Sequence, residues 1–299
     1  MPGMTVLRKI SLPFLTGLAF SGSFIAAKYT TVDLTPLVTT LLRYVIALLF
    51  FVGLMIIRKQ RVFHVEPRHI PAFIVLGLSG IVGYHFFFFA SLHHTSVANT
   101  AIINGLSPAI TGVMAALFIG ERLNAVNWLG IAMAMVGVMI LVTKGNITIL
   151  TGFDFNYGDL LMLTAVVCWS VYALIARRML DRYSALTVTL LASLFGVAAL
   201  ILMVIPEDLP GQLSTVSQES VWALLYMGIA ASGFGYLLYN LSIRSIGPTR
   251  TSGFVYSTVP LLTGLLALIF FSEPVTLTML IATILVIIGL QLALREPAR

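Results

Sequence analysis

Long apolar runs with almost no charge follow one another along the chain, separated by short polar turns. A bilayer core about 30 Å thick is crossed by about 20 apolar residues in helical form. The pattern predicts spans at Ile10–Lys28, Pro36–Ile57, Ile70–Leu92, Val97–Ile119, Ala125–Val142, Leu160–Ala176, Ser184–Pro206, Ser220–Ile243, Thr251–Ser272 and Pro274–Leu294. A membrane barrel needs alternating strands of about ten residues, whereas these runs are continuously apolar. We therefore expect an all-α membrane protein with ten transmembrane helices.

Two features of these runs need separate treatment. Arg8 and Lys9 precede the first run, which resembles a signal peptide but exceeds the usual apolar core of about 7–15 residues; we expect a retained helix. Arg43 is the sole charge expected inside a span, and no Asp or Glu is expected there.

Composition supports a lipid environment. Hydrophobic residues make up 59% of the chain and charged residues 9%, whereas soluble domains carry about 25% charged residues. The net charge of +6 is therefore not taken as a sign of nucleic-acid binding. The single cysteine, Cys168, allows no intramolecular disulfide and suggests no metal site.

Lysine and arginine fall almost entirely in every second loop. Loops on the other side hold only Lys28 and Lys144, whereas the basic side holds Arg8, Lys9, Arg58, Lys59, Arg61, Arg68, Arg122, Arg177, Arg178, Arg182, Arg244, Arg250, Arg295 and Arg299. Basic loops stay in the cytoplasm. The pattern predicts a multi-pass inner-membrane protein whose two termini are cytoplasmic.

The chain also repeats itself. A shift of 152 residues places Gly83-Tyr84 on Gly235-Tyr236, Pro108 on Pro260, Thr111-Gly112 on Thr263-Gly264 and Glu121 on Glu273, and upstream the shift is 148. We expect one five-helix repeat at 1–145, a periplasmic connection at 146–156 and a second repeat at 157–299. Because five spans are an odd number, the second repeat is inverted, and such repeats enclose a central site in many transporters. With both repeats in one chain, a monomer is sufficient.

Several of these blocks resemble a known family. They are Leu41-Leu42-Arg43, Ser107-Pro108 with Thr111-Gly112, Gly120-Glu121-Arg122-Leu123, Val259-Pro260 with Thr263-Gly264, and Ser272-Glu273-Pro274. Together they resemble the EamA-type members of the drug/metabolite transporter superfamily, over nearly the whole chain. The resemblance implies an exporter of amino acids or other small metabolites, with bacterial exporters of aromatic amino acids as plausible relatives. One departure is Ser21-Gly22-Ser23, where such proteins often have a Trp; Trp169 fills the corresponding place in the second half.

Arg43 is the first candidate for substrate binding. An arginine inside a membrane span is costly and rarely faces lipid. It could bind a substrate carboxylate, or it could be a structural lock onto backbone carbonyls or Asp33, and the sequence leaves both readings open. Lys28 lies on the same side and could share either task.

Polar and aromatic residues at related positions form the second candidate set. Buried hydroxyl and amide groups need partners in a dry bilayer, and a hydrated cavity supplies them, although aromatic residues at helical spacing also serve as packing. The set expected to line a substrate-binding cavity is Tyr84, His85, Phe88, Asn104, Trp169, Tyr172, Tyr236, Tyr239, Asn240 and Tyr256. His85 taken alone favours a packing role over proton transfer.

Other paired residues have structural readings. Pro108 and Pro260 each remove a helix hydrogen bond, and their equivalent positions favour hinges over tolerated kinks. Small residues let helices approach closely, so Gly130 and Gly137, with Ala282 and Gly289, predict packing seams. Glu121 and Glu273 are read as loop-end carboxylates that pair with Arg122 or a neighbouring helix terminus.

No catalytic motif appears: there is no Walker A loop, H-E-x-x-H or G-x-S-x-G. We expect no enzyme, cofactor or metal, with a small molecule and membrane lipid as partners. The predicted function is secondary export of neutral or zwitterionic metabolites, such as amino acids, by alternating access. A membrane-embedded enzyme on lipid-type substrates and a channel are the alternatives.

Overall fold

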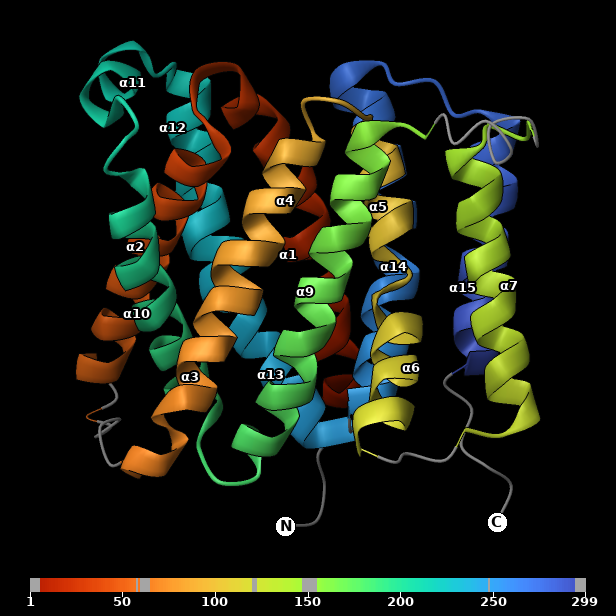
Figure 1. The fold of residues 1–299 in the computed structure, drawn as a ribbon, viewed down its shortest axis with the longest axis horizontal. Helices are drawn as coiled ribbons and strands as arrows, with labels where there is room; N and C mark the ends of the chain where they lie inside the picture. The colour runs from red at the N-terminus through yellow and green to blue at the C-terminus, as the bar shows by residue number, and fades with distance from the viewer. Residues whose placement is uncertain are drawn as a thin grey trace.

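The protein is a bundle of upright helices (Figure 1). The computed structural model describes residues 6–57, 59, 65–119, 123–146, 155–246 and 248–293, and all regular structure in these ranges is helical. The first half comprises α1 (Val6–Asp33), α2 (Pro36–Ile57), η1 (Pro67–His69), α3 (Ile70–Leu76), η2 (Gly77–Gly83), α4 (Tyr84–Ser91), α5 (Val97–Asn104), α6 (Ser107–Ile119) and α7 (Ala125–Val142). The second half comprises α9 (Tyr157–Leu180), α10 (Ala185–Val204), α11 (Leu209–Thr215), α12 (Gln218–Leu225), η3 (Tyr226–Gly235), α13 (Tyr236–Ile246), α14 (Pro248–Phe271) and α15 (Leu277–Ala293).

Seven stretches of the described residues are long and apolar enough to cross a membrane. They are Pro36–Ile57, Pro67–Ser91, Val97–Phe118, Tyr157–Leu180, Ala185–Val204, Gln218–Ser242 and Gly253–Phe271, and the shorter apolar helices are Ala125–Leu141 and Leu277–Ala293. The all-helical, membrane-spanning character expected from the sequence is confirmed. The count of ten spans goes beyond these seven and stays a prediction.

Helix α9 corrects one expectation about charge. The side chain of Asn156 accepts hydrogen bonds from the backbone N–H groups of Gly158 and Asp159, so α9 begins at Tyr157 rather than at Leu160. Asp159 therefore lies in the first turn of a candidate span, where it is 2% exposed, and the Thr95 hydroxyl donates to its carboxylate at 2.7 Å. The expectation that no Asp or Glu lies inside a span is wrong because an N-cap extends the helix.

Two π-helical segments interrupt the bundle at paired positions. Segment η2 lies between α3 and α4, η3 lies between α12 and α13, and each ends at a glycine, Gly83 or Gly235, directly before Tyr84 or Tyr236. These are the glycine–tyrosine pairs that the 152-residue shift superimposes. A π segment widens a helix by one residue per turn and is frequent at functional sites. The sequence repeat did not reveal these segments.

The two paired prolines have different surroundings. Helix α5 ends at Asn104 and α6 begins at Ser107, and the Leu106 amide turns back to the carbonyl of Ile103 at 3.0 Å. Pro108 is thus the second residue of a new helix, whereas α14 continues through Pro260. The helix of the first half is therefore broken before its proline, whereas the equivalent helix of the second half is continuous.

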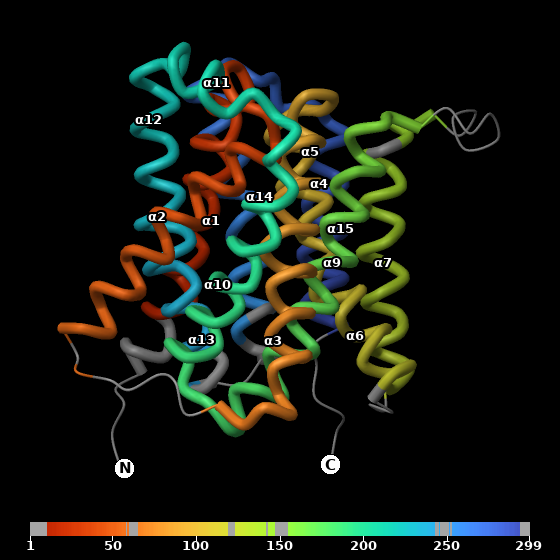
Figure 2. Tube along the Cα trace, turned by 60° about the vertical axis from the view of Figure 1, so that its left-hand side comes forward, coloured from red at the N-terminus to blue at the C-terminus, as the bar shows by residue number. Residues whose placement is uncertain are grey.

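Helices α7 and α15 pack as an antiparallel pair at one side of the bundle (Figure 2). A Cβ added to Gly130 would lie 2.2 Å from the backbone N of Ala293, and one added to Gly137 would lie 2.9 Å from the carbonyl oxygen of Ala282. Gly289 in turn meets the backbone of α7. The predicted packing seam is confirmed.

Carboxylates, among them Glu273 and Asp33, join the halves at the end of the bundle that carries α11, which we name the α11 end (top of Figure 1). The Glu273 carboxylate accepts from the backbone N–H groups of Val97 and Ala98, at 3.1 and 3.2 Å, at the start of α5. The Asp33 carboxylate accepts from Ser217 and Ser220 at the start of α12. Both anions thus meet a helix N-terminus, where the helix dipole favours them. The reading of Glu273 is confirmed; Glu121 and Arg122 lie outside the described residues.

Candidate functional site

A cavity of about 370 Å³, including its opening, lies among helices of both halves. Helices α1, α2, α4, α5, α9, α13 and α14 contribute the side chains that line it: Phe20, Ser23, Phe24, Arg43, Tyr84, His85, Phe88, Asn104, Trp169, Tyr236 and Tyr256. We call this space the central cavity.

The central cavity gathers most of the residues selected from the sequence. Eight of the candidates line it, namely Arg43, Tyr84, His85, Phe88, Asn104, Trp169, Tyr236 and Tyr256. The sequence reasoning missed Phe20, Ser23 and Phe24 of α1. A signal for Phe24 existed, because the 148-residue shift places it on Tyr172.

Three candidates do not line the central cavity. The ring of Tyr172 stacks on Trp169 with centroids 5.0 Å apart, and Tyr239 lies 6.0 Å from the same indole. The Asn240 amide donates to the Thr189 hydroxyl at 2.9 Å. All three are buried, so they support the wall of the cavity from behind.

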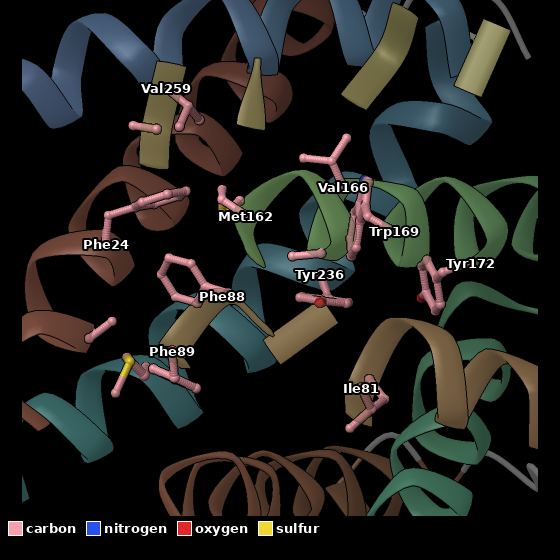
Figure 3. Packing of buried hydrophobic residues seen from close by; sticks show 14 of the residues in the cluster. Phe24, Ile81, Phe88, Phe89, Met162, Val166, Trp169, Tyr172, Tyr236 and Val259 are labelled. Atoms are coloured by element: carbon pink, nitrogen blue, oxygen red, sulfur yellow. The ribbon is translucent and has the colours of Figure 1, made fainter. Parts of the chain in front are cut away.

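The aromatic side chains enclose the cavity from several helices. Phe24 and Phe88 meet edge to face at 4.9 Å between centroids, and Trp169 lies 5.2 Å from Tyr84 and 5.6 Å from Tyr236. Figure 3 shows Phe24 with Phe88 in one group and Trp169 with Tyr236 in another, carried by ribbons of different helices. Such walls bind flat apolar groups through ring contacts.

Arg43 of α2 supplies the charge of the cavity. Its side chain is 3% exposed, its Nε donates to the Ser232 hydroxyl at 2.7 Å, and its Nη1 lies 3.7 Å from the sulfur of Met227. Both partners belong to the π segment η3. No carboxylate among the described residues pairs with Arg43. The proposed lock onto Asp33 is wrong, because Asp33 is held by Ser217 and Ser220.

Lys28 does not join Arg43 in the cavity. Its Nζ donates to the carbonyl oxygen of Leu92 at 2.8 Å, at the end of α4. A carbonyl at a helix C-terminus lacks an intrahelical donor, and the Lys28 ammonium group supplies one. Lys28 is not among the residues that line the cavity.

His85 and two tyrosines form a buried hydrogen-bonded chain along the wall. The Tyr44 hydroxyl lies 3.2 Å from Nε2 of His85 and 3.0 Å from the Tyr236 hydroxyl, while Nδ1 of His85 lies 3.0 Å from the carbonyl oxygen of Gly80. Gly80 belongs to the π segment η2. The imidazole is therefore held on both sides, as a packing residue would be, while one face still borders the cavity.

Asn104 presents its amide at the break between α5 and α6. Its side-chain oxygen accepts from the Tyr84 hydroxyl at 3.4 Å and from the Ser107 hydroxyl at 3.2 Å. The helix break thus brings Asn104 and Tyr84 together in the wall. The cavity as a whole offers one cation, several hydroxyl groups and ring faces, which suits binding of a small organic molecule.

The chain resembles membrane transporters along most of its length. Residues 7–143 and 156–295 each match the EamA-like transporter family, so the family domain occurs twice. The "Uncharacterized transporter YyaM" of Bacillus subtilis is 30% identical over 92% of this chain and 90% of its own length.

More distant relatives have names that state a cargo. The "Aromatic amino acid exporter YddG" of Ancylobacter novellus is 27% identical over 65% of this chain and 66% of its own. The "Probable terminal-alkyne amino-acid exporter" of Streptantibioticus cattleyicolor is 22% identical over 72% and 68%. A solved structure titled "Crystal structure of protein" superimposes with a TM-score of 0.69 at 24% identity, covering 95% of this chain and 96% of that one, and so shares the fold.

Proposed function

The chain belongs to the EamA-like transporter family, and we propose that it exports small neutral or zwitterionic metabolites, amino acids above all, by alternating access. Aromatic amino acids are the first candidates. The observation that carries this proposal is the central cavity, where aromatic rings from both halves surround a buried arginine that has no acidic partner among the described residues. The names of two amino-acid exporters among the relatives support the substrate class.

The proposed architecture has ten spans in two inverted five-helix repeats, at 1–145 and 157–299, joined by a periplasmic connection at 146–156. Its support is the antiparallel packing of α7 against α15, the last helix of each repeat, with Gly130 against Gly289. The distribution of lysine and arginine supports an inner-membrane protein with both termini in the cytoplasm.

In the proposed site, Arg43 binds the carboxylate of the substrate, and Phe88, Trp169, Tyr236 and Tyr256 contact its apolar part. Tyr84, His85 and Asn104 supply polar contacts. Tyr172, Tyr239 and Asn240 belong to the binding site through the wall that they support. A guanidinium is a strong partner for a carboxylate because the two groups can form charge-assisted hydrogen bonds.

Alternating access gives the contacts at the α11 end a role in the cycle. Glu273 and Asp33 each tie one half to a helix N-terminus of the other. These bonds must break whenever the cavity opens at the α11 end. Pro108 and Pro260 are the proposed hinges, and their unequal surroundings support a cycle in which the repeats exchange conformations.

Transport by a secondary carrier explains the site better than the two alternatives. A membrane enzyme would need positioned catalytic groups in the cavity, whereas its described lining is aromatic and neutral apart from Arg43. A channel would conduct without saturation. Family membership and the names of the relatives also favour a transporter.

The test is uptake and efflux of aromatic amino acids in proteoliposomes, with protein-free vesicles as the control. We expect saturable flux that is lost in Trp169→Ala. Flux would be measured with and without an imposed pH gradient. Movement against a concentration gradient that requires the pH gradient, and that vanishes in His85→Ala or Asp159→Asn, would show proton coupling. Absence of flux for a broad panel of amino acids would reject the proposed substrate class.

A further inference from the structure

Among the described residues, the lining of the central cavity contains a positive charge and no negative one. The guanidinium of Arg43 supplies the positive charge, and none of the described residues that line the cavity is acidic. The described carboxylates lie elsewhere in the fold: Asp33, Glu66, Asp159, Asp181, Glu207, Asp208, Glu219 and Glu273. A ligand with a net negative charge would neutralise the cavity, whereas a zwitterion would not.

The guanidinium of Arg43 has donors to spare. Nε bonds to Ser232, and Nη1 meets only the weakly accepting sulfur of Met227. Nη2 has no hydrogen-bond partner among the described residues. Burying a charged group without partners is costly, and the side chain is 97% buried. A ligand carboxylate beside Nη1 and Nη2 of Arg43 would supply the missing hydrogen-bond acceptors.

The described lining of the cavity offers no carboxylate to the ammonium group of an amino acid. The amide oxygen of Asn104 accepts from the Tyr84 hydroxyl at 3.4 Å, while the single proton of the Ser107 hydroxyl lies closer to the Asn104 backbone carbonyl, at 2.7 Å, than to the amide oxygen, at 3.2 Å. The remaining lining offers ring faces and hydroxyl groups, which hold a cation less strongly than a carboxylate does. An α-ammonium group, one carbon away from the bound carboxylate, would also lie beside the Arg43 cation, where a poorly screened environment strengthens repulsion.

We propose that this site recognises aromatic monocarboxylates through Arg43, and that the α-amino group of an amino acid is dispensable for binding. The inference rests on the proposed transport function and extends its substrates from zwitterionic amino acids to the corresponding anions. Deaminated aryl carboxylates bind at least as tightly as the amino acids themselves. The rings select the flat apolar part, and the arginine selects the acid.

The test compares three compounds that share one ring and differ only in charged groups: L-phenylalanine, 3-phenylpropanoate and 2-phenylethylamine. The chain has three tryptophans, and Trp128 and Trp222 are 49% and 64% exposed. Replacing both by Phe leaves Trp169, in the cavity wall, as the single reporter. Binding at pH 7.5 in nanodiscs would be followed by its fluorescence.

We expect 3-phenylpropanoate to bind as tightly as phenylalanine or more tightly, and 2-phenylethylamine to bind at least tenfold more weakly than either. Arg43→Gln should weaken both carboxylates by about ten- to a hundredfold, the usual scale for a lost charged hydrogen bond, and leave the amine unchanged. Arg68→Gln is the matched control, because Arg68 is exposed and, among the described residues, forms an ion pair only with Glu66. Arg43→Lys keeps the charge and should retain a preference for the acids.

The outcomes separate this inference from the transport proposal. Flux of phenylalanine together with tenfold weaker binding of 3-phenylpropanoate would overturn the inference alone. Binding of the amine as tight as that of the acid would overturn it as well. Lack of flux for all three compounds, despite binding, would count against the transport proposal and leave the recognition rule standing. If Arg43→Gln does not fold, the inference is still tested by comparing the three compounds on the parent chain and on Arg43→Lys.

Discussion

Residues at equivalent positions of the two repeats can differ in their hydrogen bonds. Thr111 and Thr263 occupy equivalent positions. The Thr111 hydroxyl donates to the Ser107 carbonyl at 2.7 Å and lies 3.0 Å from the Ser170 hydroxyl. The buried hydroxyl of Thr263 has no partner among the described residues. Removing a bonded hydroxyl leaves its partners unsatisfied, whereas removing an unbonded one does not.

The two threonines give opposite predictions for the stability of the protein. Thr263→Val should leave the melting temperature in detergent unchanged or raise it. Thr111→Val should lower stability by about 0.5–1.5 kcal/mol, the usual net value of a hydrogen bond. Thermal unfolding of the two variants beside the parent would check this, and an equal loss in both would mean that Thr263 has a partner in solution.

Asp33 gives a prediction for pH. Hydrogen bonds from the hydroxyls of Ser217 and Ser220, and from the Ser217 backbone N–H, hold the pKa of this carboxyl below its ordinary value of 3.8. A lowered pKa means that the bonds to α12 stabilise the fold at neutral pH and are lost as the pH falls below 3.8 through the folded-state pKa. Asp33→Asn should therefore melt lower than the parent at pH 7, and the difference should shrink below about pH 4.

A control for this variant exists in the second half. Asp181 is the counterpart of Asp33 under the 148-residue shift. Its exposed carboxylate makes no hydrogen bond or ion pair with the described residues, so Asp181→Asn should leave the melting curve unchanged at every pH. A pH-independent difference between Asp33→Asn and the parent would rule out the carboxylate as the cause.

Whole elements are held together by close backbone approach as well as by apolar burial. Helices α7 and α15 meet where Gly130 and Gly289 lack side chains, and van der Waals contact drives helix association in lipid because burial from water does not. Some other glycines are not in close contact with a neighbouring helix. A Cβ added to Gly53 of α2 would meet nothing within 4 Å.

This contrast gives a prediction at the scale of a helix pair. Gly130→Ala places a methyl group 2.2 Å from the backbone N of Ala293, which forces α15 to move. We expect a loss of about 1–3 kcal/mol, as for other overpacked sites, whereas Gly53→Ala should cost nothing and could gain stability through helix propensity. Thermal unfolding in detergent measures both. Equal melting temperatures would mean that the seam yields without strain.

At the scale of the whole molecule, the two halves share one cavity and are joined at the α11 end by carboxylates that include Glu273 and Asp33. The beginning of α1 and the end of α15 both lie at the end of the bundle opposite the α11 end (Figure 1). An even number of membrane crossings brings the two ends of a chain to the same side, so this arrangement agrees with the ten spans that we propose.

The topology prediction follows. A phosphatase fused after Arg299 should be inactive and a fluorescent protein at the same place should fluoresce, because a cytoplasmic C-terminus lets only the latter fold. A second fusion within the connection around residue 150 should give the opposite result and serves as the control. Phosphatase activity at the C-terminus would require an odd number of spans and would contradict the inverted repeat.

The sequence by itself determined the membrane environment, the repeat and the pool of candidate residues, because these depend on composition and on residue pairs at a fixed shift. Only the tertiary structure decided which faces turn inward. In a bilayer, lipid-facing and protein-facing positions are both apolar, so hydrophobic periodicity cannot separate them. That is why Phe20 and Phe24 were missed and why Tyr172 lies behind Trp169 rather than in the cavity. The partners of Arg43 and the burial of Asp159 likewise depend on a π segment and a helix cap that bring distant segments together.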